Sequence, residues 1–98
     1  MQITITGKHL EVRPGMRTHV ERHLDKFKRY DESLREAHVL LTMEKYMYVA
    51  EVTLHGKGTN LFAASHSKGN LYVAIDATIE KLEAQLRKRT EKLKAHPH

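Results

Sequence analysis

One line of apolar residues at helical spacing dominates the last quarter of the chain. Its members are Leu71, Ile75, Ile79, Leu82 and Leu86, with Leu93 as a candidate extension. The spacing predicts a single long helix over residues 70 to about 94, with Asn70 as its N-cap. A helix with one apolar face has to bury that face, so it needs another element packed along it.

A second, shorter helix is expected over residues 14–29. Pro14 suits its first position, where the missing amide donor is not needed. Arg13 before it is a poor cap, so the start of this helix is weakly marked. The apolar face is formed by residues that recur at helical spacing, namely Met16, Val20, Leu24 and Phe27.

Four segments are predicted as strands: residues 2–6, 36–45, 47–55 and 59–66. In the first three the side chains divide between two faces by alternation, and the fourth follows the Gly56-Lys57-Gly58 turn and has an apolar centre. Short turns join the last three, which predicts an antiparallel meander. Phe62, at the centre of the last strand, is expected in the core together with Phe27.

The element order β-α-β-β-β-α predicts an α+β fold in two layers. A four-stranded sheet would carry both helices on one face, and its other face would be open to solvent. With 98 residues, the chain is long enough for one small domain. We expect that domain to span residues 1–94, followed by a short flexible tail over residues 95–98.

Positive charge is concentrated on the long helix. Residues 81–98 hold six basic and two acidic side chains, in a chain with 17 basic and 12 acidic residues overall. A rigid element with this charge suits a polyanion, because neutralising phosphates releases condensed counterions. Nucleic acid is the first candidate partner, an anionic membrane surface is the second, and a merely solubilising basic end is the alternative.

Both helices carry basic residues away from their predicted buried faces. On the shorter helix these are Arg22, Lys26 and Arg29, with His19 beside them. On the long helix one row holds Lys81, Gln85, Lys88 and Lys92, and a neighbouring side holds Arg87 and Lys94. If the helices pack side by side, the two rows are expected to merge into one basic, groove-like patch.

Acidic residues limit this interpretation. Asp76, Glu80 and Glu83 lie in the first half of the long helix, where the helix dipole favours negative charge. Glu80 and Glu83 can pair with Arg87 and Lys88, which would weaken the patch. The alternative is a pair of amphipathic helices with ordinary solvated faces.

Other kinds of site have little support. Cysteine is absent, so disulfides and thiolate metal sites are excluded. His19 and His23 have the i, i+4 spacing that can hold one zinc ion, but they lack the His-Glu-x-x-His pattern and no third ligand is marked. Ser65 and His66 are neighbours on a strand and point to opposite faces. We therefore expect no enzyme activity, metal, cofactor or small-molecule substrate.

Two further expectations concern the surface. No apolar run approaches the ~18 residues needed to span a bilayer, so we expect no membrane-spanning segment. Because nucleic acid is preferred to a membrane surface, we also expect no membrane partner. Tyr46 and Tyr48 lie at a predicted hairpin, where supporting the turn is favoured over stacking on bases.

Several stretches together resemble the bacterial ribosome hibernation-promoting factors, also called the ribosome-associated inhibitor or sigma-54 modulation protein family. They are residues 1–7, 22–30, 55–58, 71–76 and 81–88. The resemblance extends from Met1 to about Lys94, and residues 72–88 are its most specific part.

This resemblance implies a domain similar in shape to double-stranded-RNA-binding domains. It implies docking in the cytoplasm on the small ribosomal subunit near the decoding centre, where messenger RNA and the A- and P-site transfer RNAs lie. Translation would be silenced in stationary phase or starvation. The contacts to ribosomal RNA would come from Arg22, Lys26, Arg29, Lys81, Arg87 and Lys88.

A tail this short is similar to the short type of the family, which cooperates with a separate modulation factor to favour inactive ribosome dimers. Two positions depart from the pattern of the family: Ala84 replaces a commonly basic residue, and Gly69-Asn70 replaces an acidic pair.

One rival hypothesis is a protein-interaction module that regulates a transcription factor through the open sheet face or an edge strand. Another is a general duplex-RNA-binding domain.

Overall fold

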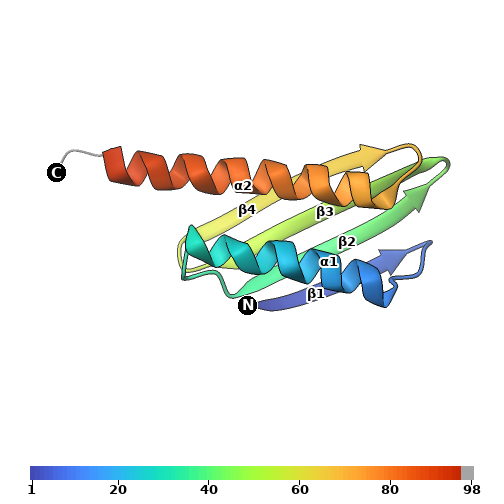
Figure 1. Cartoon of the computed structure of the whole chain (residues 1–98), viewed down its shortest axis with the longest axis horizontal. Helices are drawn as coiled ribbons and strands as arrows, with labels where there is room; N and C mark the ends of the chain where they lie inside the picture. The colour runs from blue at the N-terminus through green and yellow to red at the C-terminus, as the bar shows by residue number, and fades with distance from the viewer. Residues whose placement is uncertain (96–98) are drawn as a thin grey trace.

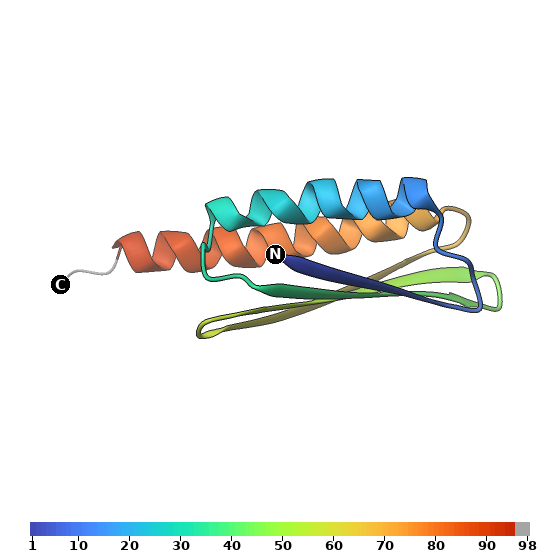
Figure 2. The same cartoon turned by 90° about the horizontal axis from the view of Figure 1, so that it is seen from below.

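Two helices lie side by side on one face of a four-stranded sheet in the computed structural model (Figure 1, Figure 2). The structure describes the backbone of residues 1–95 and the side chains of residues 1–90. The elements are β1 (Gln2–Lys8), α1 (Pro14–Asp25), the 3-10 turn η1 (Lys26–Arg29), β2 (Glu36–Glu44), β3 (Met47–Gly56), β4 (Thr59–Ser67) and α2 (Leu71–Ala95). The predicted element order and two-layer α+β class are confirmed. Of the predicted tail, Ala95 belongs to α2, and residues 96–98 lie outside the described part.

The sheet has the strand order β1-β2-β3-β4 and is mixed. The last three strands form the predicted antiparallel meander, in which Val52 lies opposite both Val39 and Ala63. β1 pairs with β2 in parallel, with Ile5 opposite Val39. A parallel pair needs a crossover connection, and α1 supplies it. α1 therefore lies over the β1–β2 side of the sheet, while α2 packs on β3 and β4 (Figure 1).

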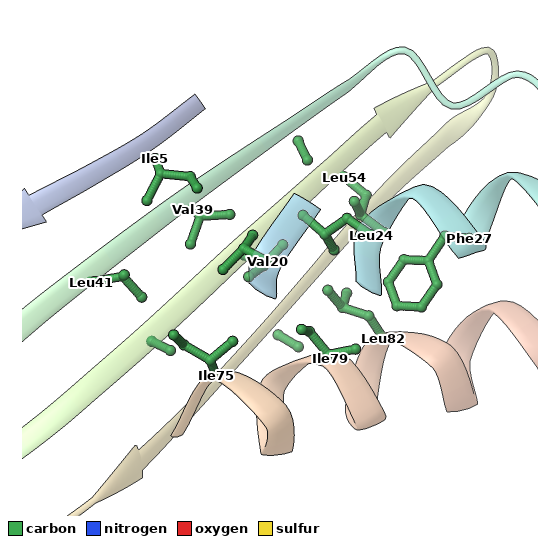
Figure 3. Close-up of a cluster of buried hydrophobic side chains, with 14 of the residues drawn as sticks. Ile5, Val20, Leu24, Phe27, Val39, Leu41, Leu54, Ile75, Ile79 and Leu82 are labelled. Atoms are coloured by element: carbon green, nitrogen blue, oxygen red, sulfur yellow. The ribbon is translucent and has the colours of Figure 1, made fainter. Parts of the chain in front are cut away.

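One hydrophobic core fills the space between the two layers (Figure 3). The sheet contributes residues such as Val39 and Leu54, and both helices contribute their predicted apolar lines. Leu24 of α1 and Leu82 of α2 are wholly buried. Met16 is half-buried and packs against the core, and Leu93 lies outside the described side chains. The helical periodicity thus predicted the buried faces of both helices correctly.

Phe62 does not belong to the core, contrary to the prediction. Its side chain is 54% exposed. Ala63, the next residue, faces the helices and is buried, so the alternation of a strand turns Phe62 to the opposite face. There it lies in register beside Thr53, Thr53 lies beside His38, and His38 lies beside Thr4 on the edge strand β1. The open sheet face therefore carries one large aromatic ring among polar neighbours.

Asp31 ties the segment after η1 to the start of β4. Its carboxylate accepts hydrogen bonds from the Ser33 amide at 2.9 Å, the Ser33 hydroxyl at 2.6 Å and the Thr59 hydroxyl. Gly56 allows this close approach, since a Cβ there would come within 2.9 Å of the Ser33 carbonyl oxygen. Burial alone would raise the pKa of Asp31. The hydrogen bonds, with the Arg89 guanidinium nearby, outweigh burial and hold the pKa below its ordinary value.

Asp31→Asn is expected to lower the free energy of unfolding by about 1–2 kcal/mol at neutral pH, because a neutral amide is a weaker acceptor for these hydrogen bonds. A carboxyl whose pKa is lowered by folding contributes its full stabilisation above its unfolded pKa of about 4. That contribution is lost as the pH falls through the folded pKa. Urea unfolding should therefore show the gap between wild type and variant narrowing at about pH 2.5.

Glu32→Gln is the matched control for this prediction, because Glu32 is the exposed neighbour of Asp31. It should leave the stability nearly unchanged at both pH values. If the difference in the free energy of unfolding between wild type and Asp31→Asn is as large at about pH 2.5 as at neutral pH, the assigned role of the carboxylate is wrong.

Candidate nucleic-acid interface

Arg22, Lys26 and Arg29 project from the outer side of α1 and η1, as predicted. All three side chains are exposed, because the opposite side of the same helix buries Val20 and Leu24 in the core. The Arg29 Nε donates a hydrogen bond to the Lys26 carbonyl oxygen at 3.3 Å. We call these three residues the α1 basic strip. Guanidinium and ammonium groups exposed in this way can contact phosphates.

A hollow of about 400 Å³ lies between α2 and the end of α1 with η1. Lys26 and Arg29 line one side of it, and Asp76, Glu80 and Glu83 line the other from α2. The side of α2 that faces α1 is therefore acidic. The expected merging of the two basic rows into one groove is wrong for the described residues, because this acidic seam of three carboxylates lies between the helices.

Side chains of the first half of the chain engage two of the seam carboxylates. His19 Nε2 lies 2.6 Å from Asp76 Oδ1. The Tyr30 hydroxyl donates to Glu83 Oε2 at 3.2 Å. The second oxygen of Glu83 lies 3.6 Å from Arg87 Nη2, which is the local pairing foreseen from the sequence. These contacts make the seam part of the packing between the helices as well as a charged surface.

Lys81 and Gln85, predicted members of the RNA-binding row, turn toward the edge of the sheet. Lys81 Nζ donates to the Ala64 carbonyl oxygen at 2.6 Å, and Gln85 Nε2 donates to the Phe62 carbonyl oxygen at 3.2 Å. Both carbonyls belong to β4, the outer strand on this side of the sheet. Unpaired groups along an edge strand invite pairing with another chain. These two side chains therefore cover the β4 edge.

The remaining cations of α2 lie on more than one side of the helix. Arg87 and Lys88 are exposed. Arg89, which was not singled out from the sequence, donates from Nη2 to the Gly58 carbonyl oxygen at 2.8 Å and so fastens α2 to the β3–β4 turn. Lys92, the last predicted residue of the row, lies outside the described side chains. The predicted RNA-binding residues therefore do not form one row. The α1 basic strip lies across the hollow from the acidic seam, Arg87 follows Glu83 by one turn on the seam's own side of α2, and Lys88 lies about 100° further round the helix.

His23 lines the same hollow as the seam carboxylates and is half-buried. Burial lowers the pKa of His23, and so do the charges of His19, Lys26 and Arg22, while Asp76 opposes them. Near neutral pH, His23 therefore adds little positive charge to the α1 basic strip.

The other end of the sheet offers a more apolar surface. A hollow of about 660 Å³ beside the β2–β3 turn is lined by residues that include Tyr46, Met47 and Val49. Tyr46 is 85% exposed, whereas Tyr48 packs against the core, so the predicted supporting role fits Tyr48. Neither helix in the described part of the chain is both long and apolar enough to cross a bilayer.

The chain is similar to known proteins over nearly its whole length. The family model for sigma 54 modulation protein / S30EA ribosomal protein matches residues 3–94. Proteins named ribosome hibernation promoting factor from Klebsiella oxytoca and Escherichia coli (strain K12) are each 34% identical over 96 residues, which is 98% of this chain and 100% of theirs.

Solved structures share the fold. A ribosomal subunit interface protein from Coxiella burnetii superposes with a TM-score of 0.84 at 24% identity, covering 94% of this chain and all of that one. The N-terminal domain of Thermus thermophilus Protein Y superposes with a TM-score of 0.81 at 28% identity, covering 90% of this chain and 98% of that one.

The β4 edge generates a testable prediction. Removing both donors in Lys81→Met/Gln85→Leu leaves the carbonyls of Ala64 and Phe62 to water or to another strand. We expect a loss of about 1 kcal/mol in the free energy of unfolding and self-association at high protein concentration. Urea denaturation and sedimentation velocity measure the two effects.

Lys88→Met is the control, because it removes one positive charge from the same helix without touching β4. It should stay monomeric at wild-type stability. If the double variant behaves like this control in both measurements, Lys81 and Gln85 do not protect the edge.

Proposed function

The chain belongs to the sigma 54 modulation protein / S30EA ribosomal protein family, and we propose that it binds the small ribosomal subunit near the decoding centre, blocks the messenger and transfer RNA sites and inhibits translation. It would favour inactive ribosome dimers in stationary phase, in cooperation with a separate modulation factor. The observation that carries the proposal is the near full-length similarity to proteins named ribosome hibernation promoting factor. Such factors are binding proteins, and this chain is one of their family rather than an enzyme.

The surface chemistry supports ribosomal RNA as the contacted molecule. The α1 basic strip presents two guanidinium groups and one ammonium group to solvent. Arg87 and Lys88 present further cations on α2, Arg87 beside Glu83 at the end of the acidic seam, and Lys92 follows Lys88 by one turn in the sequence. Cations on both helices suit several phosphates, with the carboxylates of the seam facing a gap between them. Folded RNA offers phosphates in such fixed positions, so shape counts for more than base sequence.

This arrangement implies a steric mechanism. The helices and sheet form a preorganised body whose contacts require no chemical step. A body of this kind occupies the channel that messenger and transfer RNA would use, and it competes with them for the same surface. A protein that acts on the ribosome in this way would work in the cytoplasm.

Charge reversal tests the interface. Arg22→Glu/Lys26→Glu and Arg87→Glu/Lys88→Glu should each weaken binding to purified small subunits at least about tenfold, because attraction to phosphate becomes repulsion. The melting temperature should change little, since all four side chains are exposed. Co-sedimentation with subunits measures binding, and circular dichroism follows melting.

Lys45→Glu/Lys68→Glu is the matched control for charge reversal, because both lysines are exposed near the β2–β3 turn, away from the α1 basic strip and from Arg87 and Lys88. It should bind as the wild type does. If both interface variants sediment with subunits as fully as this control, the residue assignment is wrong.

Binding should also weaken steeply with salt. Five phosphate contacts, from Arg22, Lys26, Arg29, Arg87 and Lys88, predict a slope of about −3.5 to −4.5 in a plot of log affinity against log salt concentration. Lys81 is left out of this number because its ammonium group donates to the Ala64 carbonyl oxygen. Fluorescence titration of labelled protein with subunits measures the slope. A flat response would instead indicate docking through ribosomal proteins.

Ribonuclease treatment and naked RNA separate the rival functions. A protein-interaction module that regulates a transcription factor would keep its partners after ribonuclease digestion, whereas a ribosome-bound factor would lose them. A general duplex-RNA-binding domain would bind naked duplex RNA as tightly as it binds subunits. Either result would overturn the proposed function.

A further inference from the structure

Three side chains with metal-binding atoms meet between the second and third turns of α1 and the second turn of α2, where the two helices lie side by side. His19 and His23 lie one turn apart on α1, and Asp76 reaches them from α2. One nitrogen of each imidazole and one carboxylate oxygen all lie within 4.8 Å of one another. The two imidazole rings have their centroids 4.6 Å apart. Asp76 is 57 residues from His19 in the chain, so the sequence alone could not mark it as a third ligand.

The donor set is one that zinc and related divalent transition metals accept. Neutral imidazole nitrogens bind zinc at about 2.0–2.1 Å and carboxylate oxygens at about 2.0–2.2 Å, which places tetrahedral ligand atoms roughly 3.4 Å apart. Side-chain rotations that move the ligand atoms by about an ångström bring the cluster to that geometry. The exposed fractions of the side chains, 24% for His19 and 51% for Asp76, leave room for such rotations.

We propose that His19, His23 and Asp76 bind a single divalent transition-metal ion, with zinc as the best fit, and that this ion links α1 to α2. The hollow lined by His23 and Asp76 opens beside the cluster. A water molecule from that hollow completes the coordination, as in three-ligand zinc sites.

Some neighbouring groups favour a bound cation at this site, and others oppose it. The Tyr72 ring packs edge-on against His19, with centroids 5.1 Å apart, and restricts the orientation of the imidazole. Glu80 lines the adjoining hollow and favours a cation. Arg22, beside His23 on α1, and Lys26, at the start of η1, oppose it.

The role of His23 distinguishes a metal site from a simple pairing of side chains. An ion pair or hydrogen bond between the helices needs only His19 and Asp76, which already lie 2.6 Å apart. A metal site needs His23 as well. Removing the His23 imidazole should therefore leave a simple pairing intact but abolish a three-ligand site.

Metal binding would hold α1 and α2 together more firmly. Within the described residues, one polar contact between side chains joins α1 to α2, and it is the contact of His19 with Asp76. An ion bound there replaces one hydrogen bond by three coordinate bonds. It thereby fixes the separation of the exposed cations that the two helices carry.

The test uses the full chain after removal of metal with EDTA. Titration with cobalt(II) should give one equivalent of visible absorption typical of low-coordinate cobalt, and zinc should displace it with the same stoichiometry. Zinc at about 100 times its dissociation constant should raise the melting temperature by about 10 °C, because it binds the folded state. His19→Gln, His23→Gln and Asp76→Asn should each weaken zinc binding at least tenfold in calorimetry.

Two control variants account for the other histidines. His38→Gln/His55→Gln alters a pair of rings on the sheet with centroids 5.6 Å apart, and His96→Gln/His98→Gln alters the two histidines at the end of the sequence. Both controls should retain the one-equivalent site. The proposal is overturned if His23→Gln binds zinc like the wild type, if only the His96→Gln/His98→Gln variant loses binding, or if the wild type takes up no metal. His23→Gln keeps the test decisive should His19→Gln or Asp76→Asn fail to fold.

Discussion

Burial of one face of α2 against β3 and β4 is the interaction on which the rest of the structure depends. Leu82 and Leu86 are almost completely excluded from solvent, and each such side chain contributes roughly 1.5–3 kcal/mol when buried. The buried face also sets the rotation of the helix about its axis. Asp76 and Glu83 must then face α1, and Lys81 must face the outer strand. Packing of apolar groups thereby decides where each charge of α2 is presented.

The helices and the core could be predicted from the sequence because helical periodicity is a local signal. The prediction places Phe62 in the core because its side chain is hydrophobic. The alternation of the strand instead turns Phe62 to the open face, opposite to its buried neighbour Ala63. The basic rows were expected to merge because a helical projection shows which side is buried but not which element lies to each side of it. Contacts between residues far apart in the chain, such as Asp76 with His19, carry no local signal and appear only in the fold.

The separation of basic from acidic side chains affects which polyanions the surface can bind. A continuous cationic wall would attract any polyanion of suitable size. The acidic seam on α2 repels a phosphate placed between the helices, while the α1 basic strip and Lys88 can accept phosphates outside it. The carboxylates thus add discrimination and the exposed cations add affinity. The covered β4 edge works in the same direction, because it removes one route by which unrelated chains could attach.

The mixed pairing of the sheet has a consequence for how the chain reaches its native state. β2, β3 and β4 are connected by tight turns, so their contacts close short loops and can form early. β1 meets β2 only after the whole of α1 has crossed the sheet, which makes it the pairing with the largest loop to close. The β2–β4 meander with α2 is therefore the part expected to nucleate folding, and the N-terminal strand is the part expected to dock last and to detach first.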